Sequence, residues 1–119
     1  MSSRNLVICD PETEYAARLA AFLNGKRELA FQVKTCKSPD QIREAAGQMP
    51  VDILLIADEG RELYDMQSEG EKADKTVLLT SEREEREDVD AIFKYQSGEH
   101  ICMRLVQLLA KGEKADLLR

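Results

Sequence analysis

The sequence lacks any long apolar run and any excess of positive charge. No stretch of its 119 residues approaches the roughly 18 to 20 apolar residues that a membrane-spanning helix needs, and residues 1–5 are polar. We therefore expect no membrane insertion, no signal peptide and a cytoplasmic location. The formal net charge of -6 argues against a general electrostatic attraction to nucleic acid or to anionic membranes.

Cysteine and histidine are also scarce. Cys9, Cys36 and Cys102 are odd in number, widely spaced and embedded in apolar segments, which favours reduced, buried thiols over a disulfide framework or a zinc site. The single histidine, His100, has no serine or cysteine partner implied, so we interpret it as a surface residue. A P-loop is excluded because no Gly-x-x-x-x-Gly-Lys occurs.

The most informative stretch that is present is residues 51–57. Its apolar residues run without a break from Ile53 to Ala57, between Pro50 and the acidic Asp58. Such a run predicts a strand that is buried on both faces, and therefore the centre of a parallel sheet with helices on both sides. Ligands usually bind at the carboxyl end of such a strand.

Four further segments have the pattern of strands: residues 5–9, 29–36, 76–80 and 91–95. The alternation in residues 29–36 is typical of an edge strand, because only one face is deeply covered. With the central strand they alternate with helical segments, which predicts a doubly wound α/β fold. We expect a flavodoxin-like, five-stranded parallel sheet with the strand order 2-1-3-4-5.

The helical segments differ in strength. Asp10 and Pro11 suit the N-cap and first position of a helix that ends near Asn24, and Ser38 suits the N-cap of a second helix, with Gln41 completing a capping box. Residues 58–75 support only a short or irregular helix. Residues 82–90 leave room for one turn, because a complete crossover needs at least about 10 to 12 residues. The third and fourth helices are therefore expected to be shortened.

The last helix is expected over residues 99–111, with apolar residues at helical spacing. Residues 112–119 are mostly polar. We expect one domain, residues 1–111, followed by the start of a linker to a domain that this chain does not contain.

Polar residues meet at the carboxyl edge of the predicted sheet: Asp10 with Glu12, Asp58 with Glu59, Thr80 with Ser81, and Lys94. This constellation resembles the receiver domain of response regulators, which is CheY-like, over residues 6–109. The resemblance is carried by Asp10 after the first strand, Thr80 at the end of the fourth and Lys94 in the fifth.

In that family an acidic pair holds magnesium, an aspartate at the end of the third strand accepts a phosphoryl group, and the threonine and lysine sense it. Here Ala57 takes the acceptor position. Asp58 is displaced by one residue, which turns its side chain to the other side of the strand unless a bulge compensates. Pro11 stands at the second acidic position, with Glu12 as the nearest substitute. The resemblance thus implies a pseudo-receiver that is not an enzyme and has no cofactor; any metal would be held by Asp10.

Structural roles account for some of the same residues. Asp10 can serve simply as a helix N-cap, and Thr80 can simply cap a strand. Lys94 can neutralise Asp10 in a structural ion pair. We expect the pair between Lys94 and Asp10 under either interpretation.

A narrower resemblance rests on the shortened helices and on residues 92–97, Ile-Phe-Lys-Tyr-Gln-Ser. Together they are similar to the degenerate receiver of the CpaE/TadZ-like pilus assembly ATPases, which are MinD/ParA relatives. This resemblance implies an interaction, localisation or dimerisation module at a cell pole, whose partners are an ATPase domain of the same full-length chain and pilus assembly components. The interaction candidates are Phe93, Tyr95 and Gln96. We also expect a homodimer through the flank of the fourth and fifth strands.

Two other functions remain open. The first is an active phosphoacceptor domain of two-component signalling, in which Asp58 follows a bulge and Asp10 and Glu12 hold Mg²⁺. The second is nucleotide or flavin binding at the same strand ends, which the loops support least because they lack a glycine-rich or hydroxyl-rich run.

Overall fold

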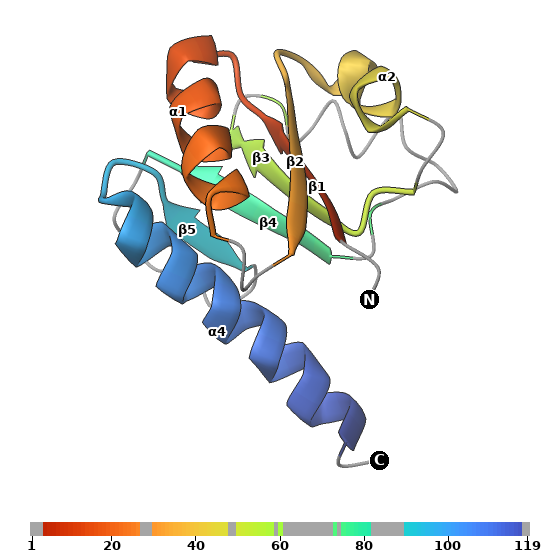
Figure 1. Cartoon of the computed structure of the whole chain (residues 1–119), viewed down its shortest axis with the longest axis vertical. Coiled ribbons are helices and arrows are strands. Elements are labelled where there is room, and N and C mark those ends of the chain that lie inside the picture. Colours follow the sequence, from red (N-terminus) through yellow and green to blue (C-terminus); the bar gives the residue numbers. More distant parts are fainter. Residues whose placement is uncertain are drawn as a thin grey trace.

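Five parallel strands form one sheet in the order β2-β1-β3-β4-β5 (Figure 1). The computed structural model describes residues 4–26, 30–47, 50–58, 60, 73, 75–81 and 90–117. The strands are β1 (Arg4–Cys9), β2 (Phe31–Cys36), β3 (Ile53–Ala57), β4 (Lys75–Thr80) and β5 (Ala91–Phe93). The predicted fold class and strand order are confirmed.

Helices lie on both faces of this sheet. They are α1 (Thr13–Asn24), the short α2 (Ile42–Ala46) after a 3-10 turn (Pro39–Gln41), and the long α4 (Gly98–Leu117). Apolar residues of α1 and α4 share one core cluster with one face of the sheet, whereas Ile42 of α2 belongs to a second cluster on the other face. Among the described residues, none of the helices has the length and apolar character that crossing a membrane requires.

The central strand is buried on both faces, as its sequence predicts. Ile53 and Leu55 pack in the core under α1 and α4, and Leu54 and Ile56 pack in the smaller core under α2. All of β3 is buried. In the edge strand β2 the side chains of residues 31–34 alternate between core and solvent, so this part buries only one face. Because β3 lies between β1 and β4 in a parallel sheet, the carboxyl ends of these three strands are neighbours.

The prediction that Asp10 caps the first helix is wrong. The helix begins at Thr13, and Glu12 occupies the cap position without a side-chain cap hydrogen bond. Asp10 is wholly buried, and its Oδ1 accepts a hydrogen bond of 2.8 Å from the backbone N–H of Glu12. This is an Asx turn, which competes with helix initiation. Asp10 and Pro11 therefore form a turn that directs the Asp10 carboxylate into the sheet edge.

The predicted capping box at the second helix is also not formed as expected. The Ser38 hydroxyl contacts the Asp40 carboxylate rather than a helical backbone N–H. Gln41 Oε1 accepts a hydrogen bond of 3.0 Å from the backbone N–H of Lys37, one residue before the expected donor. The Ser38 side chain thus accepts no hydrogen bond from the first backbone N–H groups of the helical segment. This segment begins with a 3-10 turn, and α2 follows it.

Several element ends differ from the predictions. β2 begins at Phe31, after Ala30 in the left-handed region with φ of 52°. β5 ends at Phe93, so Lys94 follows the strand instead of lying within it. α4 continues beyond residue 111 to Leu117, because a single glycine followed by good helix formers does not stop a helix. The expected shortening of the third and fourth helices concerns residues 58–75 and 82–90, most of which lie outside the described residues.

Candidate functional site

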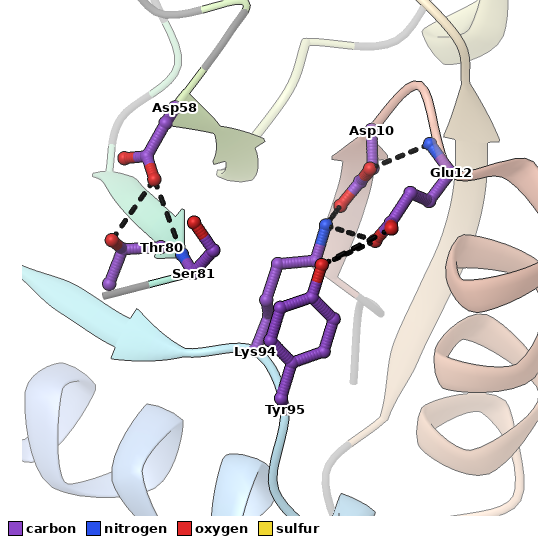
Figure 2. A network of polar contacts seen from close by, with 7 residues as sticks. All are labelled: Asp10, Glu12, Asp58, Thr80, Ser81, Lys94 and Tyr95. Atoms are coloured by element: carbon purple, nitrogen blue, oxygen red, sulfur yellow. Dashed lines mark hydrogen bonds and ion pairs between the residues drawn. The ribbon is translucent and has the colours of Figure 1, made fainter. Parts of the chain in front are cut away.

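Lys94 is the centre of the first polar group at the carboxyl edge of the sheet. Its Nζ lies 2.6 Å from Asp10 Oδ2 and 2.6 Å from Glu12 Oε2. Asp10 is completely buried and Lys94 is 4% exposed, whereas the Glu12 side chain is half exposed. We call Asp10, Glu12, Lys94 and Tyr95 the lysine cluster (Figure 2). The predicted ion pair between Lys94 and Asp10 is therefore formed.

The positions of β1 and β5 in the sheet determine how far the Lys94 side chain must extend to meet Asp10. Lys94 follows β5, and its backbone N–H donates a hydrogen bond of 2.9 Å to the Thr80 carbonyl of β4, so the backbone there still runs along the sheet. Asp10 follows β1, on the other side of β3 and β4. The Lys94 side chain thus reaches from the end of β5 past the ends of β3 and β4 to Asp10.

Two tyrosine rings surround the Lys94 ammonium group. Its Nζ lies 4.8 Å from the ring centroid of Tyr15 and 5.4 Å from that of Tyr95. The Tyr95 hydroxyl lies 3.2 Å from each carboxylate oxygen of Glu12, to which it donates. Because cation–π contacts and a shared carboxylate both favour the ammonium form, this environment holds Lys94 charged.

The pKa directions agree with that geometry. Burial lowers the pKa of Lys94, but its hydrogen bonds to Asp10 and Glu12 outweigh burial and raise it above its usual value. The hydrogen bond from Lys94 lowers the pKa of Glu12. Burial raises the pKa of Tyr15 to about 12 and also raises that of Tyr95. At neutral pH Lys94 is therefore a cation that faces two neutral phenols.

A second polar group lies at the ends of β3 and β4. Asp58 Oδ2 accepts hydrogen bonds from the Thr80 hydroxyl at 3.0 Å and from the backbone N–H of Ser81 at 3.2 Å. We call Asp58, Thr80 and Ser81 the threonine cluster. Figure 2 shows it as separate from the lysine cluster, with the Asp58 carboxylate directed toward β4.

The two central positions of the predicted pocket differ in chemistry. Ala57 ends β3 with its methyl group buried. Asp58 is the next residue and lies beyond the strand, half-buried. The displaced carboxylate is thus used by the threonine cluster, as expected from a shift of one residue along a strand.

Each oxygen of the buried Asp10 carboxylate already has a donor within the protein. Both oxygens of Asp10 already accept hydrogen bonds, Oδ1 from the Glu12 backbone and Oδ2 from Lys94. Magnesium prefers carboxylate and phosphate oxygens in near-octahedral geometry. In the part of the chain that the structure describes, no three histidine, cysteine or acidic residues are grouped as a metal site would require. Glu59 lies outside that part.

The interaction candidates lie just beyond β5. Phe93 is half-buried, and its ring meets that of Tyr95 edge-on at a centroid separation of 5.9 Å. The Tyr95 side chain is 54% exposed. The Gln96 side chain turns back, and its Nε2 donates a hydrogen bond of 2.7 Å to the carbonyl of Phe93, the last residue of β5.

An open groove of about 880 Å³ runs beside the lysine cluster, between α1 and the segment that leads into α4. Glu12, Tyr15, Lys94 and Tyr95 line its part nearest the cluster, and Phe22 and other apolar residues line the rest. Its walls are mixed in charge, since Glu14 and Arg18 also contribute.

Sequence reasoning missed the role of Tyr15, because its spacing from Leu19 and Leu23 is that of any core-facing residue of an amphipathic helix. The structure places its ring against Lys94 and near Tyr95, at a centroid separation of 6.5 Å. The sequence did offer one signal for this role. Tyr15 lies in the first turn of the helix that follows Asp10, and that turn lies over the carboxyl end of β1.

Comparisons with known proteins support the fold. Neither the search with protein-family models nor the search of curated protein sequences finds a match. Among solved structures, the chain is similar to a response regulator receiver domain (CheY-like) from Methylobacillus flagellatus, with a TM-score of 0.65 and 17% sequence identity. The match covers 89% of this chain and 98% of that one. The chain therefore has the flavodoxin-like fold of a CheY-like receiver domain.

Proposed function

We propose that this chain is a pseudo-receiver that neither transfers nor accepts a phosphoryl group. It acts by protein contact, as the interaction, localisation or dimerisation module of a TadZ/CpaE-like pilus assembly ATPase. It needs no cofactor in this role. Its place is the cytoplasm, at the cell pole where such an ATPase would assemble.

The observation that carries the non-catalytic part is the pairing of Lys94 with Asp10 and Glu12. The two carboxylates that would hold magnesium are bound to an ammonium group at 2.6 Å each. A metal ion could bind these carboxylates only by displacing the Lys94 ammonium group from them. The carboxylates at this edge are therefore already bound to donors of the protein itself, without a metal or a phosphoryl group.

The end of β3 supports the same proposal. A phosphoacceptor needs a carboxylate that faces the lysine and the metal. Ala57 supplies only a methyl group there, and the Asp58 carboxylate accepts hydrogen bonds from Thr80 and Ser81. The threonine hydroxyl, which would otherwise contact a phosphoryl group, is thus used internally.

The interaction part is supported by exposed apolar side chains. Tyr95, Met103 and Val106 are 54%, 57% and 39% exposed. Met103 and Val106 are three residues apart on α4 and so lie on one face of the helix. Apolar side chains gathered on one exposed helix face are commonly partner surfaces. The attached ATPase domain and a second copy of this chain are the proposed partners.

Incubation with acetyl phosphate and magnesium, followed by intact mass spectrometry, tests the non-catalytic part. We expect no phosphoryl adduct. An adduct that is lost in Asp58→Asn but kept in Glu99→Gln, an exposed carboxylate on α4, would establish the alternative, an active phosphoacceptor using Asp58 with Mg²⁺.

Sedimentation velocity over a range of concentrations tests the interaction part. We expect a dimer that Met103→Glu weakens and that Gln32→Glu, the same charge added at an exposed polar position of the edge strand β2, leaves unchanged. A strict monomer at high concentration would contradict dimerisation. A dimer that responds equally to both variants would place the contact elsewhere.

A further inference from the structure

Two of the three cysteines lie side by side at the ends of neighbouring strands. Cys9 is the last residue of β1 and Cys36 the last of β2, and the two are register partners in the parallel pairing. Neighbouring strands lie about 4.8 Å apart, and register partners point to the same face of the sheet. A disulfide usually joins Cα atoms about 4.4 to 6.8 Å apart, so this pairing is within reach of one.

The two thiols have different environments. Cys9 is buried, whereas Cys36 is half-buried and open to small molecules from solvent. Cys36 packs at the border of the small core under α2, and Cys9 lies inside that core. The Cys9 thiol donates a hydrogen bond to the Cys36 sulfur. This bond lowers the pKa of Cys36 and raises the pKa of Cys9. Cys36 is therefore the accessible thiol with the greater thiolate character, and Cys9 is the protected thiol beside it.

We propose that Cys9 and Cys36 form a reversible redox site that closes to a disulfide when the chain meets a hydroperoxide. The inference rests on the register and burial of these two residues and is independent of the proposed function. Cys102 lies in α4, on the other face of the sheet, and takes no part.

The chemistry balances with hydrogen peroxide as the oxidant. The Cys36 thiolate attacks one peroxide oxygen, the O–O bond breaks, and Cys36 becomes a sulfenic acid while hydroxide leaves. The Cys9 sulfur then attacks the Cys36 sulfur, forming the S–S bond. The departing hydroxyl takes the Cys9 proton and leaves as water. In sum, two thiols and one peroxide give one disulfide and two waters, and a dithiol reductant reverses the change.

The site is connected to the lysine cluster through the backbone. Asp10 follows Cys9 directly, and its N–H donates a hydrogen bond of 3.1 Å to the Cys36 carbonyl. A Cys9–Cys36 bond would fix the ends of β1 and β2 at the point where the chain turns Asp10 toward Lys94. Oxidation would therefore act on the turn that positions the buried carboxylate.

Thiol counting tests the proposal. The reduced chain is treated with hydrogen peroxide, unfolded in the presence of N-ethylmaleimide and weighed. We expect the number of alkylated cysteines to fall from three to one. Peptide mapping should then join Cys9 to Cys36, with the alkylated residue at Cys102. Dithiothreitol before alkylation should restore all three.

Single substitutions assign the roles. Cys102→Ser should still form the bond, and Cys36→Ser should form none. Cys9→Ser should leave a sulfenic acid on Cys36 that dimedone traps. Three alkylated thiols after peroxide, a bond only between two chains, or direct overoxidation of Cys36 in the unmutated chain would each overturn the proposal.

Discussion

The lysine cluster and the threonine cluster occupy the same edge of the sheet but are built differently. The first is an ion-paired group whose central cation and aspartate are buried. The second is a half-buried carboxylate that accepts hydrogen bonds from a hydroxyl and a backbone N–H. Under the proposed function, the two clusters are the separated parts of a relic phosphorylation pocket, because Asp58 comes one residue after the end of β3.

The two clusters differ in where their carboxylates find partners. With Ala57 at the end of β3, Lys94 finds its counter-charges on the β1 side and Asp58 finds its donors on the β4 side. The carboxylates of each group thus find hydrogen-bond donors within their own cluster. The comparison predicts a large loss of stability when the lysine cluster is broken and a small one when the threonine cluster is broken.

Removing the Lys94 charge should have the largest effect. Lys94→Met keeps the buried stem but leaves Asp10 without its counter-charge. The free energy of unfolding should fall by about 3 to 5 kcal/mol, because an uncompensated charge then remains buried. Urea denaturation at neutral pH measures the change.

Two controls decide whether the charge is the cause. Glu99→Gln breaks the exposed pair between Lys26 and Glu99, which are 2.6 Å apart with Glu99 63% exposed, and should cost at most about 1 kcal/mol. Asp10→Asn combined with Lys94→Met removes both buried charges and should recover most of the loss. A double variant as unstable as Lys94→Met would show that packing, not charge, is responsible.

The buried phenol of Tyr15 should have an intermediate effect at alkaline pH. Its folded-state pKa, about 12, lies above the ordinary 10.0, so its contribution to stability is complete below about pH 10 and is lost as the pH rises toward 12. Tyr15→Phe should reduce that alkaline loss by on the order of 1 to 2 kcal/mol.

The same variant should not destabilise the protein at neutral pH. The Tyr15 hydroxyl is buried and finds no hydrogen-bond partner within the described residues. Removing an unsatisfied hydroxyl is neutral or stabilising. Urea denaturation at two pH values separates the effects, and equal alkaline slopes in both proteins would contradict the assignment.

Breaking the threonine cluster should cost less. Thr80→Val removes the hydroxyl that donates to Asp58 and should lower the free energy of unfolding by about 1 kcal/mol. The loss stays small because the half-buried Asp58 carboxylate can bind water in place of the hydroxyl. Thr80→Ser keeps the hydroxyl and is the matched control. A loss as large as that of Lys94→Met would remove the distinction between the clusters.

The smallest effect should come from the exposed rim of the lysine cluster. Tyr95→Phe removes only the hydroxyl bonded to Glu12, and it should leave the free energy of unfolding nearly unchanged, since both groups are exposed to water. Thermal unfolding of Tyr95→Phe beside the unmutated chain is sufficient. A larger loss would mean that the hydroxyl helps to hold Glu12 on Lys94.

Much of the fold follows from local pattern. The unbroken apolar run that forms β3 and the alternation of β2 specify a central and an edge strand, and the helical segments between strands then specify the order of the sheet. The pair between Lys94 and Asp10 also follows, because both residues come after strands whose carboxyl ends share one edge.

The remaining features depend on contacts distant in sequence. Asp10 looked like a helix cap, and only its burial beside Lys94 shows why the helix begins later. The direction of the Asp58 carboxylate depends on donors at the end of β4. The pairing of Cys9 with Cys36 depends on strand register, which spacing along the chain does not reveal.

Amide NMR during a magnesium titration, with and without beryllofluoride as a phosphoryl mimic, tests the central claim most directly. We expect no saturating shifts at Asp10, Ala57, Asp58, Thr80 and Lys94, because the pocket is already satisfied by its own side chains. Shifts that saturate together at these residues would contradict the pseudo-receiver and make the chain a phosphorylation switch.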